Sequence, residues 1–281
     1  MIRGARCAAV AVRKPDGEIS LRVFEIGSLY NGSFRRIPFI RGILVLAETF
    51  TLGMRALTHS ANVAIGEQEE ELGKGSVTGV VAFSLIFAVG IFFIFPLFAS
   101  RWLDSLLPSD IITNLVEGVI RLGVFLAYIT LISRMNEIRR VFMYHGAEHM
   151  TVHALEQGEP LVVSAVRKYT TAHPRCGTAF LLTVMVVAII VLAFTGREPL
   201  WWLIASRVIL IPVIAAISYE IIRYSGIYSQ NSLMRMVAVP GLVLQKLTTR
   251  KPDDDQIEVA IAAMELAIET DKERAASPGV L

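Results

Sequence analysis

The sequence predicts an α-helical polytopic membrane protein with about four transmembrane helices. Hydrophobic residues make up 54% of the 281 positions and the mean hydropathy is +0.56, which exceeds the apolar content of an ordinary soluble domain. A transmembrane helix needs about 20 mostly apolar residues. Four stretches of the chain meet this need, and they are residues 78–99, 111–133, 178–194 and 200–222.

Two elements are expected before the first span. Residues 8–12 and 19–26 alternate in polarity around a Lys-Pro-Asp-Gly turn at 14–17, a pattern typical of a small β-hairpin. Residues 37–64 are apolar but carry several charged side chains. If this segment crossed the membrane, the eight basic residues up to Arg41 would lie outside. We therefore expect it to form a re-entrant or interfacial helix.

Cytosolic amphipathic helices are expected after the last span. Residues 232–247 resemble an interfacial helix interrupted at Pro240-Gly241. Three aspartates at 253–255 can begin a further helix, in which apolar residues recur at helical spacing and indicate core packing. These residues are Ile257, Ile261, Met264 and Ile268, and residues 275–281 are expected to fray.

Basic residues orient the predicted spans. Ten Lys and Arg precede the first span, six separate the second from the third, and seven follow the fourth, whereas the other two connections carry one each. The positive-inside rule then predicts that both termini and the loop 134–177 are cytoplasmic in a multi-pass protein of the cell inner membrane or plasma membrane. In the reducing cytosol, the two cysteines would be free thiols or ligands.

The expected organisation has three parts, with a lipid bilayer as the surrounding partner. Residues 1–77 hold the hairpin and the interfacial helix, residues 78–222 form the four-span membrane domain with the His-rich loop 134–177, and residues 223–281 form the C-terminal helices. The net charge of +2 is small, and no basic patch is interleaved with aromatic residues. Nucleic acid is therefore not expected as a partner.

A histidine cluster is the most informative motif. Four of the five histidines and one of the two cysteines fall between positions 145 and 176. On a helix, His145 and His149 share one face with Glu148 beside them. This is the H-x-x-E-H pattern that presents two zinc ligands and a catalytic base. The motif predicts a divalent metal site, with zinc as the expected ion and Glu148 as the general base.

The remaining ligands are open between several candidates. His153 continues the helical spacing, His173 and Cys176 offer a nitrogen and a sulfur, and Glu220 is a distant carboxylate of the kind such sites recruit. Each also has a structural explanation, because histidines can bond carbonyl groups and Glu220 can pair with Arg223. For the two histidine clusters to meet, the chain must bend between Arg134 and His145, or the loop 158–172 must climb towards the helix. We expect the bend, with His145 and His149 close to either His173 or Cys176.

Charged residues inside the spans form a second group. Glu117 and Arg121 are one helical turn apart in the second span, and Arg207 lies deep in the fourth. An unpaired charge at such depth costs about 2.5 kcal/mol or more, so mutual neutralisation is expected. We predict that Glu117 and Arg207 pair directly or through Arg121 and Asn114, as an assembly clamp rather than a conduction path, and that exchanging their charges recovers part of the stability.

Seven short strings of the chain point to one family. They are Tyr-His-Gly-Ala-Glu-His at 144–149, Arg-Lys-Tyr at 167–169, His-Pro-Arg-Cys-Gly-Thr at 173–178, Ile-Pro-Phe-Ile-Arg-Gly at 37–42, Asn-Leu-Val-Glu-Gly at 114–118, Ile-Ser-Tyr-Glu at 217–220 and Thr-Thr-Arg-Lys-Pro-Asp-Asp at 248–254. These strings resemble the YqhQ-like family of bacterial membrane proteins, which are uncharacterised and predicted to be metal-dependent enzymes. Members usually carry a Gly-Gln-Ala-Val-Ile-Glu-Gly-like segment before the position of Met1, so we expect a trimmed start or a misplaced initiator Met here.

Two classes of function are compatible with these motifs. The first is a membrane-embedded metal-dependent enzyme facing the cytoplasm, expected to be a hydrolase that uses metal-activated water. The second is a non-enzymatic transporter or assembly factor with a structural or regulatory metal. An open coordination position favours the enzyme, and a closed ligand set favours the structural role. Glycine-rich phosphate loops and serine elbows are absent from the sequence, so kinase, dehydrogenase and serine hydrolase activities are not expected.

Overall fold

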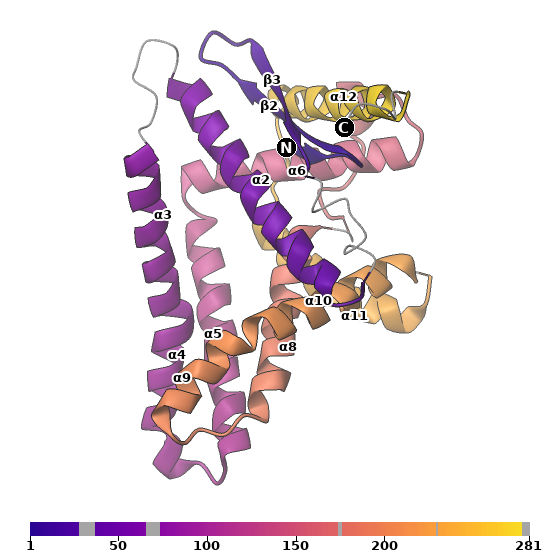
Figure 1. Ribbon diagram of the computed structural model, residues 1–281. Coiled ribbons are helices and arrows are strands. Elements are labelled where there is room, and N and C mark those ends of the chain that lie inside the picture. Colours follow the sequence, from indigo (N-terminus) through magenta and orange to yellow (C-terminus); the bar gives the residue numbers. More distant parts are fainter. Residues whose placement is uncertain (28–36, 66–73, 174–175, 229, 277–281) are drawn as a thin grey trace.

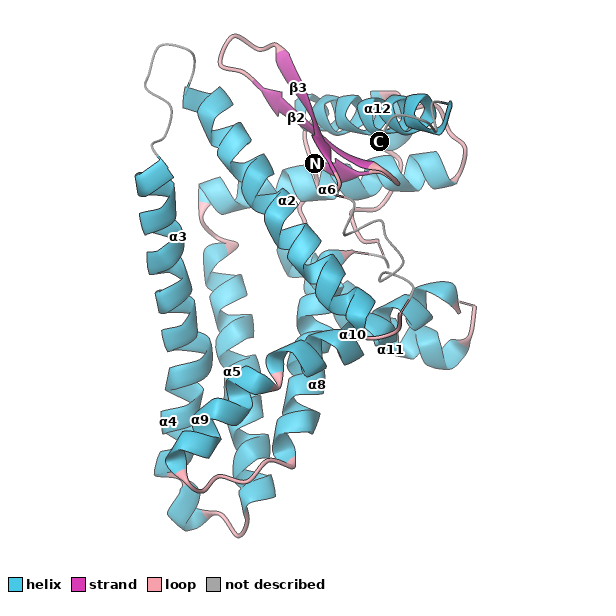
Figure 2. Cartoon of the chain, viewed as in Figure 1, coloured by secondary structure: helices cyan, strands magenta, loops and turns pink. Residues whose placement is uncertain are grey.

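The computed structural model describes residues 1–27, 37–65, 74–173, 176–228 and 230–276. Long apolar helices form a bundle, and a layer made of a small sheet and two helices lies across one end of it (Figures 1 and 2). Both chain termini lie in this layer. Within the described residues, three helices are long and apolar enough to cross a membrane, and they are Thr78–Trp102, Asp110–Ile132 and Leu200–Ile227.

The first two predicted spans are confirmed as long apolar helices. The first consists of α3 (Lys74–Val89), a π-helical turn η2 (Gly90–Ile94) and α4 (Phe95–Trp102). A short 3-10 turn, η3 (Asp104–Leu106), leads into the second, α5 (Asp110–Ile132). The Ser109 side chain caps α5 by accepting a hydrogen bond from the Ile112 amide, which satisfies a free donor at the start of the helix.

The other two predicted spans differ from a simple crossing helix. Helix α8 (Gly177–Ala193) is strongly apolar but has only 17 residues, which is at the lower limit for a span. The last span is divided at Leu210 into α9 (Leu200–Ile209) and α10 (Ile211–Ile227). Pro212 stands at the start of α10, and proline cannot donate the hydrogen bond that would continue a regular helix.

Helix α2 (Ile40–Ile65) is the segment for which the sequence left two forms open. It is one continuous helix of 26 residues and does not turn back as a re-entrant loop would. Figure 1 shows it crossing diagonally from the end of α10 to the sheet, and it packs on both. The crossing is close at Gly42, where an added Cβ would lie 2.9 Å from Cβ of Tyr219.

The predicted hairpin is confirmed, with an additional short strand. β1 (Ile2–Arg3), β2 (Cys7–Arg13) and β3 (Ile19–Glu25) form an antiparallel sheet in that order. Gly17 has φ +91° in the turn between β2 and β3, a conformation that favours glycine. β1 has only two residues, and so short a segment shows no detectable alternation of polarity.

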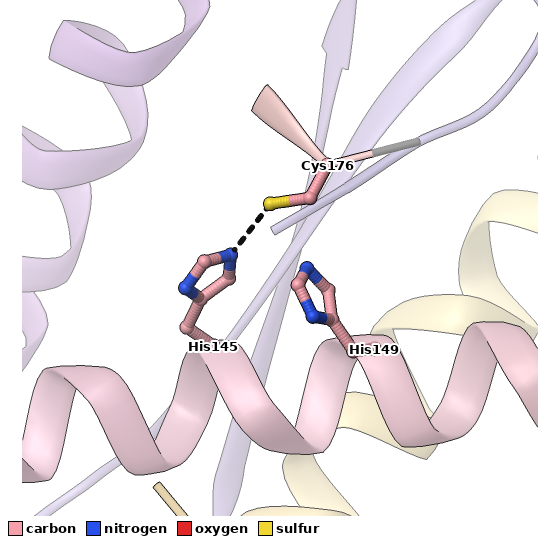
Figure 3. A group of neighbouring side chains, drawn as sticks. All are labelled: His145, His149 and Cys176. Atoms are coloured by element: carbon pink, nitrogen blue, oxygen red, sulfur yellow. Dashed lines mark hydrogen bonds between the residues drawn. The ribbon is translucent and has the colours of Figure 1, made fainter. Parts of the chain in front are cut away.

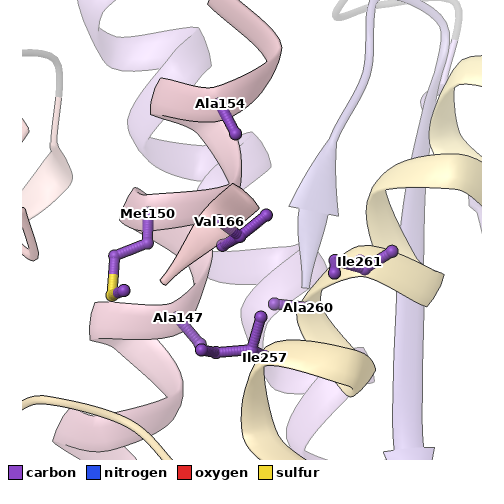
Figure 4. Packing of buried hydrophobic residues seen from close by; sticks show 7 residues of the cluster. All are labelled: Ala147, Met150, Ala154, Val166, Ile257, Ala260 and Ile261. Atoms are coloured by element: carbon purple, nitrogen blue, oxygen red, sulfur yellow. The ribbon is translucent and has the colours of Figure 1, made fainter. Parts of the chain in front are cut away.

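The layer above the bundle is built from both ends of the chain. Helix α12 (Asp254–Ala276) packs against α6 (Asn136–Glu156), the short α7 (Val163–Val166) and the sheet. Figure 4 shows one core of this layer, in which side chains of α6, α7 and α12 meet. Residues 277–281 of the expected frayed tail lie outside the described residues. The buried residues of this core are Ala147, Met150, Ala154, Val166, Ile257, Ala260 and Ile261.

The apolar stripe expected in α12 is part of the core. Ile257, Ile261 and Met264 are buried, and Ile268 is partly buried against Ile2 and its neighbours. The interruption expected at Pro240 is wrong, because α11 (Ser232–Thr248) continues through this residue. A proline inside a helix removes one hydrogen bond, and packing against α8 and α10 can offset such a loss.

The charged residues inside the spans meet, as the sequence predicts. Carboxylate oxygens of Glu117 lie 2.6 Å from the guanidinium of Arg121 and 2.9 Å from that of Arg207. The side-chain oxygen of Asn114 accepts from Arg207 at 2.8 Å. Arg197, which the sequence analysis did not include, also reaches Glu117 at 3.0 Å from the segment between α8 and α9. One buried carboxylate therefore joins three guanidinium groups.

Candidate metal centre

The chain bends sharply just before the histidine helix. Helix α5 ends at Ile132, Met135 has extended backbone angles (φ −72°, ψ 136°), and α6 begins at Asn136. The bend lies at the start of the interval in which the sequence predicted it. As a result, all of α6 runs across the end of the bundle (Figure 1). This orientation brings its histidines over the beginning of α8, where Cys176 lies.

His145, His149 and Cys176 converge on one point (Figure 3). One ligand atom from each lies within 4.8 Å of the others. Nε2 of His145 is 3.1 Å from Sγ of Cys176, and the two imidazole rings are 4.4 Å apart between centroids. His149 is buried, and the other two side chains are half-buried. The sequence prediction that His145 and His149 meet either His173 or Cys176 is therefore confirmed for Cys176.

Backbone carbonyl groups orient both imidazoles of this group. Nδ1 of His145 lies 2.9 Å from the Thr248 carbonyl oxygen, and Nδ1 of His149 lies 2.6 Å from the Thr171 carbonyl oxygen. Because a carbonyl oxygen only accepts, each Nδ1 must carry the proton. In the neutral ring, Nε2 then presents a lone pair. Partners of this kind fix the tautomer and orientation of metal-binding histidines.

A second group lies further along the same helix. One ligand atom each from His153, Glu156 and His173 lies within 4.8 Å of the others. Nε2 of His173 is 3.3 Å from Oε2 of Glu156, and Nε2 of His153 donates to the Ala172 carbonyl at 2.8 Å. The rings of His149 and His173 are 5.9 Å apart. The two groups are adjacent but share no residue.

Electrostatic effects favour the ligating form of Cys176. Burial raises the pKa of this thiol, but hydrogen bonds from His145 and His149 outweigh burial and lower the pKa to about 5. At neutral pH the side chain is therefore a thiolate, the form that binds metals. Burial lowers the pKa of His145, yet its contact with Cys176 and the Thr248 carbonyl produces a net rise. A metal would have to displace the proton that His145 shares with the thiolate.

Two residues predicted for the site lie elsewhere or face another partner. Glu220 forms an ion pair with Arg41 and accepts a hydrogen bond from the Phe39 amide at 3.1 Å, where α2 crosses α10. It joins neither ligand group, and Arg41 is its ion-pair partner among the described residues. The Glu148 carboxylate contacts the amino group of Met1. Its charge still acts on His145 and raises the pKa of that imidazole.

The sequence analysis did not identify the residues that hold the histidines in place. Gln245 is fully buried and brackets His173, because it accepts from the His173 amide at 2.8 Å and donates to its carbonyl at 2.9 Å. Thr171 and Thr248 act through backbone oxygens. Every residue has a carbonyl group, so no sequence signal marks those that orient a ligand. Gln245 is a polar residue in a largely apolar stretch of α11, and this placement was detectable in the sequence.

Comparison with known proteins identifies a family. The family model described as "Protein of unknown function (DUF1385)" matches residues 37–270. The chain is also similar to "Uncharacterized protein YqhQ" of Bacillus subtilis (strain 168), with 32% identity over 280 residues that cover 93% of this chain and 86% of the relative. No solved structure matches. Both matches span most of the chain, and the chain therefore belongs to the DUF1385 family of proteins of unknown function.

Proposed function

We propose that this protein is a membrane-embedded metal-dependent enzyme whose site faces the cytoplasm, with hydrolysis as its reaction. The observation that carries the proposal is the convergence of His145, His149 and Cys176 within 4.8 Å, with both imidazoles oriented by carbonyl groups. If these histidines served only as interfacial hydrogen-bond donors to carbonyl groups, their second ring nitrogens would not be expected to point at a thiolate. The cytoplasmic location rests on the distribution of basic residues in the sequence.

The donor set fits zinc. Two imidazole nitrogens and one thiolate sulfur are ligands that zinc prefers, and three protein ligands leave one position of a tetrahedral ion open. An open position is typical of catalytic sites, whereas structural zinc sites use four protein ligands. The ion would supply Lewis-acid chemistry and lower the pKa of water at that position. The residues of the chain would position the ion, exclude competing ligands and accept the proton.

Glu148 is the proposed proton acceptor. It follows His145 by three positions on α6, one helical turn away. Its charge acts on His145 but its carboxylate belongs to neither ligand group. Replacing a base while sparing the ligands should abolish activity and leave the metal in place. We expect Glu148→Gln to retain metal yet fail to complement a strain that lacks the protein. Full complementation would contradict the enzymatic role.

The second group, His153, Glu156 and His173, is proposed as a separate ion position. Two imidazoles and one carboxylate are the ligands of many hydrolytic zinc sites. Because the groups share no residue, no ligand of the two described groups would bridge the two ions. The alternative is that Glu156 orients His173, as carboxylates do for histidines in the outer shell of metal sites. The metal content of the protein distinguishes these cases.

Metal analysis of the detergent-purified protein tests both positions. We expect two zinc ions per wild-type chain, and one in each of His149→Ala and His153→Ala. The chain offers a matched control in His59→Ala, because His59 lies on α2, packs edge-to-face with Phe24 and belongs to neither group. This variant should keep both ions. Wild-type metal content in His149→Ala would contradict the proposal, and a single ion in the wild type that His153→Ala keeps would remove the second position.

A second candidate function follows from the same contact. Cys176 and His145 lie 3.1 Å apart, and the Thr248 carbonyl orients the imidazole, which is the arrangement of an activated cysteine nucleophile. A thiol-dependent enzyme would keep its activity in the presence of a chelator. The metal-dependent enzyme would lose its activity under this condition. In a transporter or assembly factor with a structural metal, His149→Ala would unfold this face, and Glu148→Gln would have no effect.

A further inference from the structure

A strongly basic cavity lies directly beside the candidate metal centre. Its volume is about 560 Å³, and its lining includes four basic side chains and no carboxylate among the described residues. The basic residues come from two segments that are far apart in the sequence, one before α8 and one at the end of α11. They are Arg167, Lys246, Arg250 and Lys251.

The cavity and the metal centre share their walls. Thr171 lines the cavity, and its carbonyl oxygen accepts a hydrogen bond from Nδ1 of His149. Thr249 also lines the cavity and directly follows Thr248, whose carbonyl holds His145. The hydroxyl oxygens of Thr171 and Thr249 lie 3.1 Å apart. A molecule bound in the cavity would therefore touch the same two segments that orient the metal-site histidines.

Among the described residues, most of the basic side chains at the cavity have no carboxylate partner. Arg167 pairs with Asp254, which is outside the lining. The Arg250 guanidinium donates to the backbone oxygens of Lys246 and Thr249, and such contacts leave its charge uncompensated. In the described part of the chain, neither Lys246 nor Lys251 has a carboxylate within ion-pair distance. Structural pairing accounts for one of four cations.

We propose that this cavity binds a phosphate group. Phosphate oxygens accept hydrogen bonds from ammonium, guanidinium and hydroxyl donors, and the cavity presents all three kinds without a repelling carboxylate. The inference deepens the proposed function and rests on it in one respect, because the phosphate would belong to the substrate of the neighbouring metal centre. The phosphate could come from a soluble molecule or from a lipid headgroup at the membrane surface.

The test measures binding by calorimetry to chelator-treated protein, so that phosphate cannot bind to metal instead. One arm uses inorganic phosphate and the other a short-chain phosphatidylglycerol. We expect the double change Lys246→Gln with Lys251→Gln to weaken binding by about tenfold or more, because the loss of even one hydrogen bond to a charged group is worth this much. The control, Lys168→Gln with Lys272→Gln, removes the same charge from residues outside the lining and should bind like the wild type.

Each outcome has a distinct meaning. Binding of inorganic phosphate supports the site and points to a soluble ligand, and binding of the lipid alone supports the site and points to a headgroup. An equal loss in the control pair would show a general electrostatic attraction and overturn the proposal, as would failure of both ligands to bind. Metal content separates this inference from the proposed function. If the purified protein binds phosphate but contains no metal, the phosphate site is supported and the proposed metal-dependent function is rejected.

Discussion

Oε2 of Glu117 lies 2.9 Å from the Arg207 guanidinium, which joins α5 to α9 inside the bundle. Both side chains are almost completely buried, with 1% and 5% exposed. Arg121 and Arg197 contact the same carboxylate, so two helices and the segment that connects α8 to α9 meet at it. Removing one partner of a buried pair leaves an uncompensated charge, which costs more than the pair itself contributes.

Glu117→Gln should therefore destabilise the protein strongly. We expect a loss of about 3 kcal/mol or more, because three guanidinium groups lose their shared carboxylate. Thermal unfolding in detergent measures the effect. Glu258→Gln is the control, since its pair with Arg13 is half exposed and such pairs contribute about 0–1 kcal/mol. Equal melting temperatures for the two variants would contradict the clamp.

The sequence analysis expected that exchanging the charges of Glu117 and Arg207 would recover part of the stability. The structure predicts that this exchange does not restore it. Combining Glu117→Arg with Arg207→Glu would bring a new guanidinium next to Arg121 and Arg197. The sequence analysis did not consider Arg197 as a neighbour of Glu117. Like charges at this distance repel in a medium of low dielectric constant. We expect the double variant to melt no higher than Arg207→Glu alone, and recovery above that single variant would show that Arg121 and Arg197 are not held near Glu117.

Gly146 should tolerate no side chain. An added Cβ would lie 2.2 Å from the Arg250 backbone oxygen and 3.1 Å from a Thr171 methyl group. Gly146→Ala would push both segments off α6, at a cost of about 1–3 kcal/mol for overpacking, and should also reduce metal content. Gly53→Ala on α2 is the control, because nothing lies within 4 Å of its added Cβ. Alanine there should stabilise the helix slightly.

The thiol of Cys7 should resist alkylation in the folded protein. Burial, reinforced by the nearby Asp271 carboxylate, raises its pKa to about 11. The thiolate is the reactive form, so iodoacetamide should leave Cys7 unmodified at pH 8 and react only as the pH approaches 11. Peptide mass spectrometry measures the modified fraction. In denaturant the residue should react as an ordinary thiol, and rapid labelling at pH 8 without denaturant would show that β2 opens.

The orientation of the chain in the membrane remains a prediction. Residue 105 lies in the turn η3 at one end of the bundle, and α6 lies at the other end (Figure 1). We expect a membrane-impermeant maleimide applied to intact cells to label Ser105→Cys and not Glu159→Cys, with the unmodified chain as the blank. Both positions are exposed. The reverse labelling pattern would place the metal centre outside and overturn the cytoplasmic assignment.

Local patterns in the sequence predicted most of the elements. The hairpin, the long apolar helices and the buried stripe of α12 follow from polarity that repeats every two residues or every turn of helix. The pairing of Glu117 with Arg207 was also predictable, because two charges at one depth in a membrane have few other partners. The break before Pro212 and the continuation of α11 through Pro240 were not predictable from the sequence. Packing against neighbouring helices decides whether a helix continues through a proline.

The sequence by itself determined which residues could bind a metal, because side-chain chemistry and the spacing of His145 and His149 are local properties. Only the tertiary structure decided how the candidates divide. It placed Cys176 against His145 and His173 beside Glu156, and it held Glu220 at Arg41. Such contacts depend on where α6 turns and how α2 crosses α10, and these crossings result from packing over the whole chain. The carbonyl groups that orient the imidazoles belong to the backbone, which is the same at every residue, so the sequence cannot identify them. Their positions are defined only after the chain has folded.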